Sequence, residues 1–320
     1  MKYFKLIMVL SVLISGCSEP NDIGSWEIVR SQSDDLTYRK IHFTNKNVGW
    51  IVGDEGTVLK TSNGGSTWQV QSSGVTAKLW GISAVSQNMV WICGTNNTLI
   101  KTTNGGSNWQ ILMQGDTLDG ILIDVAFVNE NVGWLSNNNG SIMKTVDGGN
   151  SWTLSKKHSS AGSWIFAFDE LTQYHVHGKL FRTFDGGATW DSLSILNPTN
   201  YMSTGASFPD KDHGFVSMMN GTGGMWIEEY PIVSTKDGGQ SWEESQYLET
   251  GNAGLWCTWF VDANMGWVGG SGDVFRTDDG GSSFTSEKMP NDFHPHDMMF
   301  IDKNNGWAMS YSGQVCKYSN

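Results

Sequence analysis

Histidine and aspartate side chains gather in one short run near the end of the chain. His294, His296 and Asp297 stand within four consecutive residues, and His175 and His177 alternate along an earlier segment. Alternate residues of a β-strand face the same side, and imidazole and carboxylate groups can ligate zinc. The two groups lie far apart in the chain, in units four and seven, and no third partner joins them. We therefore predict a polar rim here, with no metal site and no cofactor.

Carboxylates for acid–base chemistry are the second possibility, and Asp124 and Asp297 are the candidates. Hydrolysis of a glycosidic bond needs two carboxyl groups on either side of that bond, about 5–10 Å apart. The sequence does not set the separation of these two residues. A glycoside hydrolase or a glycan-binding protein is therefore the alternative to a binding protein that has no catalytic residue.

Both sets of residues must be positioned by a unit that recurs along the chain. The octet from Thr61 to Trp68 reads Thr-Ser-Asn-Gly-Gly-Ser-Thr-Trp, and five near copies follow it. The glycine pairs of the six octets begin at positions 64, 105, 148, 186, 238 and 280, in steps of 41, 43, 38, 52 and 42 residues. A period of about forty residues indicates one repeated supersecondary unit.

Each octet has the chemistry of a tight turn. Its Asn or Asp can accept hydrogen bonds from the backbone N–H groups that follow, and its glycines adopt a positive φ without a Cβ penalty. The pattern resembles the Asp-box turn of sialidase-type β-propellers. Sialidases use three arginines, and this chain has only Arg30, Arg39, Arg182 and Arg276. Arg182 and Arg276 occupy a repeated place before the octet and Arg30 ends a strand, so one arginine is left and a sialidase is not expected.

The rest of the chain reads as short strands separated by Gly, Asn, Asp and Ser clusters, which is typical of an all-β protein. Four antiparallel strands in about forty residues make one propeller blade. Seven units begin near residues 38, 79, 121, 163, 203, 255 and 297. The seventh stops at Asn320, before its last strand, while Gly24 to Val29 resembles that missing strand. We predict a seven-bladed β-propeller over residues 25–320, closed by the N-terminal strand.

The informative positions are those at which the repeats differ. Each first strand can be aligned on the aromatic residue eleven places later. One level then holds Arg39, Trp80, Ile123, Thr204, Trp256 and His296, with Ser163 or Trp164 from the fourth unit, and the next level holds Lys40, Gly81, Asp124, Gly205, Cys257 and Asp297. First strands line the axial channel, so these residues form its mouth. Their variety indicates a ligand surface, and a simple plug of the channel is the alternative. The predicted binding residues are Arg39, Trp80, Asp124, Trp164, Trp256, His296 and Asp297.

Two further motifs indicate the protein family. Val48-Gly49-Trp50 followed by Lys60 to Trp68, and Val132-Gly133-Trp134 followed by Lys144 to Trp152, resemble the repeat of the photosystem II stability/assembly factor-like family of seven-bladed propellers. The resemblance extends from Trp26 to Asn320. It implies a non-catalytic binding or assembly platform with a ligand or partner protein on the axial face. The photosynthetic members are described as using an arginine-rich patch, and this chain is poor in arginine. The partner is therefore an unidentified protein or glycan.

The N-terminus has the features of a bacterial lipoprotein signal. Lys2 and Lys5 precede an apolar run that is too short to span a bilayer. Ile14-Ser15-Gly16-Cys17 then resembles a lipobox, in which the cysteine is lipidated after cleavage. We predict a signal peptide at residues 1–16, a lipidated Cys17, a tether at 17–24, and a protein attached by its lipid to a membrane of the bacterial cell envelope.

The net charge argues against nucleic acid and anionic membrane surfaces as partners, and the cysteine positions predict the state of the thiols. The formal net charge is −12, and loss of Lys2 and Lys5 with the signal makes it −14. Such a balance disfavours nucleic acid and anionic membrane surfaces as partners. Cys93, Cys257 and Cys316 fall in three different repeats, which predicts buried, reduced thiols. We expect a monomer.

Overall fold

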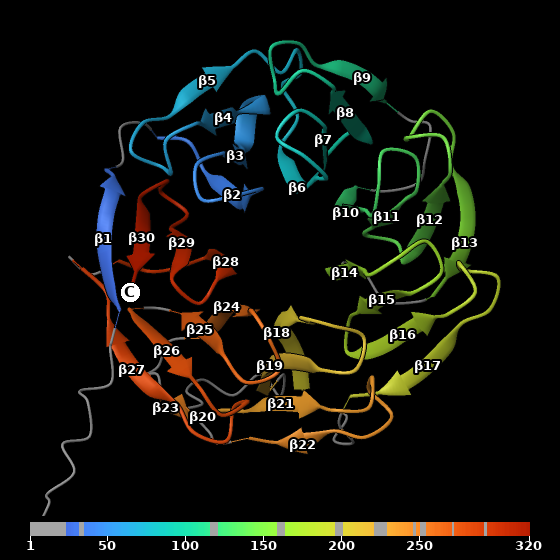
Figure 1. Cartoon of the computed structure of the whole chain (residues 1–320). Coiled ribbons are helices and arrows are strands. Elements are labelled where there is room, and N and C mark those ends of the chain that lie inside the picture. Colours follow the sequence, from blue (N-terminus) through green and yellow to red (C-terminus); the bar gives the residue numbers. More distant parts are fainter. Residues whose placement is uncertain are drawn as a thin grey trace, which may run out of the picture.

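The computed structural model of the chain is a ring of β-sheets around a central axis (Figure 1). It describes residues 24–31, 35–115, 121–158, 164–195, 201–220, 229–245, 248–249, 254–270, 272–290 and 293–320. The predictions for the signal peptide at 1–16, for Cys17 and most of the tether, and for Ser163 lie outside these residues. Within the described ranges, seven antiparallel sheets of four strands form the seven blades that the repeats predict.

The blades follow one another along the chain, and each begins with its innermost strand. Blades one and two comprise β2 (Tyr38–Phe43), β3 (Gly49–Gly53), β4 (Val58–Thr61) and β5 (Gln69–Gln71), then β6 (Leu79–Ala84), β7 (Val90–Gly94), β8 (Thr98–Thr102) and β9 (Gln110–Met113). Blades three and four comprise β10 (Leu122–Phe127), β11 (Gly133–Asn137), β12 (Ser141–Thr145) and β13 (Thr153–Lys157), then β14 (Trp164–Ala167), β15 (Gln173–Val176), β16 (Lys179–Thr183) and β17 (Asp191–Ser194).

The later blades keep this order with two additions. Blades five and six comprise β18 (Tyr201–Ser207), β19 (Gly214–Asn220), β21 (Ile232–Thr235) and β22 (Glu243–Glu244), then β24 (Leu255–Phe260), β25 (Gly266–Gly270), β26 (Asp273–Thr277) and β27 (Thr285–Lys288). Blade seven comprises β28 (Asp297–Asp302), β29 (Asn305–Met309), β30 (Val315–Ser319) and β1 (Ser25–Arg30). The additions are the pair β20 (Glu229–Tyr230) and β23 (Leu248–Glu249), and the short 3₁₀ helix η1 (Asp54–Gly56) after β3.

The hydrophobic core lies between neighbouring blades. The aromatic residue near the start of most second strands is fully buried, as Trp91, Trp267 and Trp307 illustrate. Trp91 stacks on Phe127 of the next blade with ring centroids 3.7 Å apart, and Trp267 stacks on Phe300 at 3.6 Å. Because each tryptophan packs on the following blade, the glycine–aromatic pattern of the sequence encodes contacts around the ring.

The octets form the hydrogen-bonded turns that the sequence predicts. In blade three, Thr145 Oγ1 accepts from the Gly149 N–H at 3.0 Å, and Asp147 Oδ1 accepts from the Ser151 N–H at 2.9 Å. Gly148 and Gly149 have φ of 74° and 93°, which a residue with a Cβ rarely adopts. The same acceptor bond at 2.9 Å recurs at Asn63, Asn104, Asp185, Asp237 and Asp279. The octets therefore serve the fold.

A cation just before the octet joins each of four blades to the next one. Lys60 Nζ donates to the carbonyl oxygen of Gly105 at 2.6 Å, and Lys144 Nζ donates to that of Gly186 at 2.8 Å. Lys101 makes the same bond to Gly148, and Arg182 makes it to Gly238. We call these bonds the blade clasps. All four point the same way around the ring.

The N-terminal strand closes the ring, as predicted. β1 pairs with β30, so that Trp26 lies opposite Tyr318. Trp26 is 9% exposed, and its indole N–H donates to Glu287 Oε2 of blade six at 2.9 Å. The first and last described strands therefore complete one blade together, which covers the sheet edge that β30 would otherwise expose.

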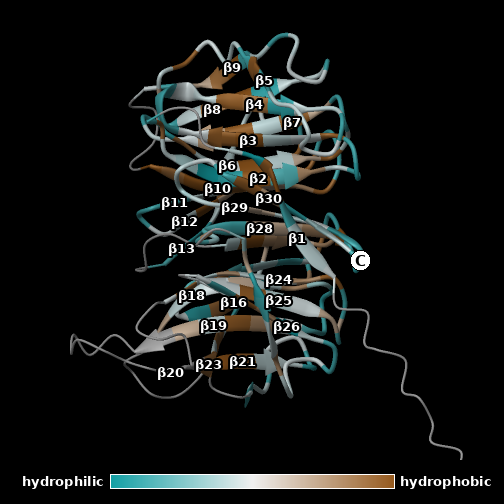
Figure 2. Cartoon of the chain, turned by 90° about the vertical axis from the view of Figure 1, so that its left-hand side faces the viewer, coloured by the Kyte–Doolittle hydropathy of each residue, from teal (hydrophilic) through white to brown (hydrophobic). Residues whose placement is uncertain are grey.

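Strand directions define two faces of the disc, which Figure 2 shows edge-on. The mouth face carries the starts of the first strands and the links between second and third strands. The octet face carries the octets and the links between first and second strands. Cys93, Cys257 and Cys316 are free and buried, as predicted. In the part of the chain that the structure describes, no helix is long and apolar enough to cross a bilayer.

Candidate functional site

The first strands share an irregularity at the level of the predicted site. In blades one, two, three, five and six the pairing with the second strand shifts by one residue. The residues left between paired neighbours are Arg39, Trp80, Ile123, Thr204 and Trp256. Such a β-bulge bends the strand and redirects the bulged side chain. Five blades therefore present one extra side chain at the same level of the channel.

All seven predicted residues line one cavity of about 390 Å³ at the mouth of the channel. They are Arg39, Trp80, Asp124, Trp164, Trp256, His296 and Asp297. Trp164 comes from the start of β14, which pairs without a bulge, and His296 immediately precedes β28. The alignment of first strands thus brought together residues that are up to 258 positions apart.

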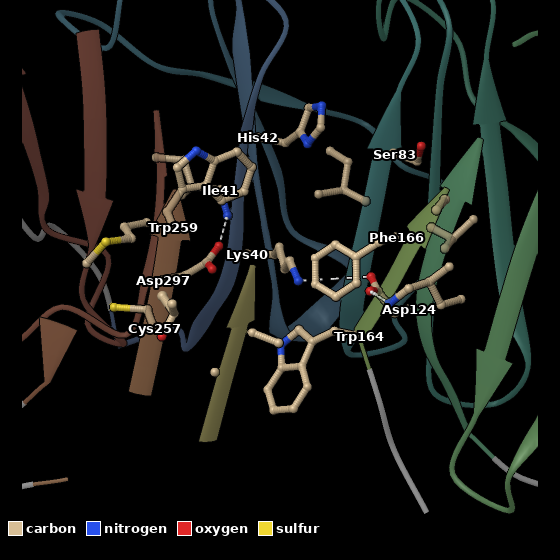
Figure 3. A pocket seen from close by; sticks show the side chains of 18 of the residues that line it. Lys40, Ile41, His42, Ser83, Asp124, Trp164, Phe166, Cys257, Trp259 and Asp297 are labelled. Carbon is tan, nitrogen blue, oxygen red and sulfur yellow. Dashed lines mark hydrogen bonds and ion pairs between the residues drawn. The ribbon is translucent and has the colours of Figure 1, made fainter. Parts of the chain in front are cut away.

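A second cavity of about 210 Å³ continues the first one down the channel. Lys40, Asp124 and Asp297 line both cavities. Figure 3 shows the Lys40 side chain extending into the channel between the two aspartates. Lys40 Nζ is 4.0 Å from Asp124 Oδ1, while Asp297 Oδ2 accepts from the Ile41 N–H at 2.8 Å. A third cavity, of about 260 Å³ and lined by Phe166 and Trp259 among others, lies toward the octet face.

Burial sets the protonation of this three-residue group, which we call the channel triad. Burial raises the pKa of Asp297 to about 6, against the opposing effect of Lys40. Burial also raises the pKa of Asp124. Burial would lower the pKa of Lys40, but Asp124 and Asp297 outweigh it and the pKa is raised. The lysine therefore stays charged, and the net charge of the triad changes near pH 6.

Arg39 lines the mouth cavity and is held there by an ion pair. Its Nε lies 2.5 Å from Asp54 Oδ1 in η1, and Lys78 Nζ lies 3.4 Å from the other oxygen of that carboxylate. The Arg39 guanidinium also lies over the Trp80 ring, 4.0 Å from its centroid. A cation on an aromatic face is attracted by the ring quadrupole. Arg39 and Trp80 therefore form one fixed wall of the mouth.

The neighbouring part of the mouth, in blades six and seven, is also aromatic. The His296 ring stacks on Tyr311, with centroids 3.4 Å apart. Burial, followed by the charges of Lys40 and Arg39, lowers the pKa of His296 to about 4, so the imidazole is neutral at pH 7. Trp256 is 44% exposed and Tyr311 is 51% exposed. These two rings are the most exposed aromatic side chains among the described residues that line the mouth.

The sequence analysis missed Tyr311 and Ser203, which also line the mouth cavity, and it named His177 only as part of a polar rim. Tyr311 follows β29 and His177 follows β15, so both belong to links between second and third strands, which an alignment of first strands does not include. His175 lies apart from the mouth, 1% exposed, with its ring 5.0 Å from that of His158. Among the described residues, no three His, Cys, Asp or Glu side chains are arranged to hold a metal ion.

The other arginines do not converge on the mouth. Arg182 and Arg276 contact residues of the octet face, through the clasp to Gly238 and an ion pair with Asp278 at 2.9 Å. Arg30 donates to the Tyr38 hydroxyl at 3.1 Å. The described residues therefore contain no arginine triad at the channel.

Comparison with known proteins confirms the predicted resemblance. Residues 19–121 match the family described as photosynthesis system II assembly factor YCF48. The photosystem II assembly lipoprotein Ycf48 of Synechocystis sp. (strain ATCC 27184 / PCC 6803 / Kazusa) is 30% identical over 89 residues. That alignment covers 27% of this chain and about a quarter (26%) of the relative.

Solved structures share the fold at low sequence identity. The structure described as YCF48 bound to D1 peptide superposes with a TM-score of 0.76 and 17% identity, over 93% of this chain and 98% of that one. A GH74 xyloglucanase from Xanthomonas campestris gives a TM-score of 0.69 and 10% identity, over 92% of this chain and 53% of that one. The similarity to the enzyme is confined to about half of its length.

Proposed function

We propose that this chain is a non-catalytic binding platform that takes a segment of a partner protein into the channel mouth. The observation that carries the proposal is the set of bulges. Five blades share the same backbone irregularity, yet each places a different side chain at it. A residue needed only for packing would recur with the repeat, as the octet residues do.

The shape and surface of the mouth suit a polypeptide segment. Its volume of about 390 Å³ falls within the ~300–1,000 Å³ range of ligand pockets. Exposed aromatic rings in a partly desolvated pocket are the usual anchors of protein interfaces, and Trp256 and Tyr311 provide them here. The relative whose structure is described as bound to D1 peptide supports a peptide ligand on this fold. The low arginine content of this chain argues against transferring the photosystem partner itself.

The proposal includes attachment to a bacterial envelope membrane through a lipid on Cys17. The Ile14-Ser15-Gly16-Cys17 run supports it, and so does the name of the Synechocystis relative, which is a lipoprotein. Cys17→Ala should yield unlipidated protein, and the domain made without residues 1–17 should remain in the aqueous fraction. Partition of that shortened domain into membranes would reveal another anchor.

A glycan ligand or glycoside hydrolysis is the second candidate, favoured by Asp124 and Asp297 in one cavity with three tryptophans. The triad argues against hydrolysis, because the Lys40 ammonium lies between the two carboxyl groups that would flank the bond. Each aspartate also already accepts a backbone hydrogen bond, from Ile165 and Ile41 respectively. Release of reducing sugar from envelope polysaccharides, abolished by Asp297→Asn, would favour the enzyme.

Capture of partners from the native envelope tests the main proposal. The full-length lipidated protein and a Trp80→Ala/Trp256→Ala variant are used as bait, and the captured polypeptides are quantified by mass spectrometry. Phe184→Ala is the matched control, because Phe184 is an aromatic residue that is 50% exposed on the octet face. We expect the double variant to lose a polypeptide that the control retains. Equal capture by folded double variant and control would move the site away from the mouth.

A further inference from the structure

We propose that the channel mouth opens away from the membrane that holds the chain, so that its partner segment must reach it from the aqueous side. The inference rests on the proposed attachment through Cys17. It adds an orientation to that attachment, and the orientation restricts the kind of partner that can bind.

The described chain begins on the octet face. Ser25 pairs with Ser319, and β1 then runs toward the mouth face, where Arg30 lies opposite Val315. Gly24 packs closely against Tyr318, because a Cβ on Gly24 would lie 2.2 Å from atoms of that ring. The C-terminus lies beside this point, on the right-hand face of the disc in Figure 2. Gly24, the last residue of the predicted tether, therefore lies on the face opposite the mouth.

The length of the tether decides which face can meet the bilayer. Seven peptide units separate Cys17 from Gly24; fully extended, they span at most about 25 Å. A flexible chain of that length has a root-mean-square span of about 15 Å. The six residues of β1 alone span about 20 Å. Pressing the mouth against the bilayer would stretch the tether almost straight along β1, whereas turning the octet face to the bilayer needs no stretching.

The charge of the octet face fits a disc that stands off the membrane. Hydrogen bonds from Ser151, Thr189 and Ser241 lower the pKa of Asp147, Asp185 and Asp237 to about 2, so these exposed carboxylates are ionised at neutral pH. An ionised carboxylate is costly to remove from water, so the octet face can lie beside the bilayer surface but does not insert into it. The mouth then lies roughly 20 Å or more above the membrane surface, given the length of the strands. Its partner must be a polypeptide segment that extends to that height.

Two matched cysteine variants in or beside blade one test the orientation. Lys46→Cys places a label on the octet face, and Lys78→Cys places one on the mouth face, where Lys78 is 55% exposed. The three cysteines of the propeller are buried and should not be labelled. The lipidated full-length protein is incorporated into phosphatidylcholine vesicles that carry a headgroup acceptor dye. We expect energy transfer to be at least twofold greater from position 46. Equal transfer, or greater transfer from position 78, would overturn the inference.

A variant with a longer tether tests whether the length of the tether causes the difference in energy transfer between the two labels. Twenty Gly and Ser residues inserted between Pro20 and Asn21 should remove most of the difference between the two labels. A difference that survives would mean that the octet face itself binds the bilayer, which contradicts an orientation set by the tether. The proposed attachment is checked separately by flotation of the vesicles. Unlabelled protein that fails to float would overturn both the attachment and the orientation, while floating protein with equal transfer would overturn the orientation alone.

Discussion

The octet face and the mouth face are both built from repeated backbone, but they differ in what is repeated. In the octets the backbone conformation and the side-chain bonds recur together, down to the same 2.9 Å hydrogen bond that the Asn or Asp oxygen accepts from a backbone N–H. At the mouth the backbone bulge recurs while the side chain changes from Arg39 to Trp80 to Trp256. The comparison shows that a repeat protein can keep one geometry and vary only the groups displayed by it. The variation marks the candidate site.

The two faces also give aspartate opposite acid–base properties. Asp237 lies in solvent and accepts hydrogen bonds from Ser241, which stabilise the carboxylate and lower its pKa to about 2. Asp297 lies in the channel, where burial raises its pKa to about 6. The octet residues therefore favour the charged form and the channel favours the neutral form of the same side chain.

The largest expected effect comes from removing β1, the N-terminal strand that completes the last blade. Deletion of residues 18–30 removes β1 and leaves β30 with an open edge. Loss of the buried Trp26 alone should lower the free energy of unfolding by about 3–5 kcal/mol. The measurement is thermal melting, with deletion of residues 18–23 as the control that keeps β1. An unchanged melting curve would contradict closure by β1.

The pH dependence of stability should differ between the aspartate of the channel and the aspartates of the octet face. Asp297 has a pKa of about 6 in the folded protein and about 3.9 in an unfolded chain. Between these values the folded state binds more protons, so the free energy of unfolding falls as the pH rises from 4 to 6, by up to about 3 kcal/mol. Asp297→Asn keeps an acceptor for Ile41 and should flatten this fall.

Urea unfolding at pH 4, 5, 6 and 7 measures the difference between wild type and variant. The octet aspartates act in another window, because stability from a lowered pKa is lost only as the pH falls from about 4 to about 2. Identical slopes for wild type and Asp297→Asn between pH 4 and 6 would show that the channel does not retain this proton.

The two mouth tryptophans should separate binding from stability. Trp256→Ala removes an exposed anchor and should weaken partner binding by about 2 kcal/mol, or roughly 30-fold. Trp80→Ala removes the ring beneath Arg39 and should also lower the melting temperature. Binding is followed by titration of the partner obtained by capture, and unfolding is followed by fluorescence. If Trp256→Ala unfolds the domain while binding per folded molecule is unchanged, the mouth residues only fill the channel and do not bind a partner.

The smallest effect is expected in a single octet. Thr145 is 1% exposed and links the Gly149 N–H to the octet. Thr145→Val keeps the shape and removes the hydroxyl, which should cost about 1–2 kcal/mol of stability and leave binding unaltered. Chemical denaturation measures the cost, and Ser62→Ala, at an exposed octet position, is the control. Loss of binding at unchanged stability would assign a functional role to the octets.

Much of the fold could be predicted from the sequence because every repeat carries the same turn and aromatic positions. The step between octets fixes the blade length, the aromatic positions fix the buried face, and Asn320 together with Trp26 reveals the divided last blade. Register within the first strands could not be predicted in detail, because a bulge is a local compromise between pairing and packing that leaves no distinct residue type. Arg39, Trp80 and Thr204 share the bulge and have nothing else in common.

The site could be predicted as a set of positions but not as a set of contacts. Equivalent places in a repeat meet at the same level, which located Arg39 and Trp256 at one level and Asp297 at the next. The ion pair between Arg39 and Asp54 joins a first strand to the following 3₁₀ helix, and its strength depends on distances that no repeat encodes. Tyr311 was missed for the same reason, since its position under His296 depends on how one loop folds over the channel.

The blade clasps have a consequence for how this architecture can be rearranged. Each clasp contacts only the next blade, and the first and last strands pair with Ser25 opposite Ser319. The position of the chain break within the ring is therefore not dictated by the blade contacts. A peptide link from Asn320 to Gly24, with the chain opened between Lys157 and Trp164, should yield a circular permutant with the same ring. Its new terminus would emerge beside the mouth, and a lipid placed there would turn the molecule over.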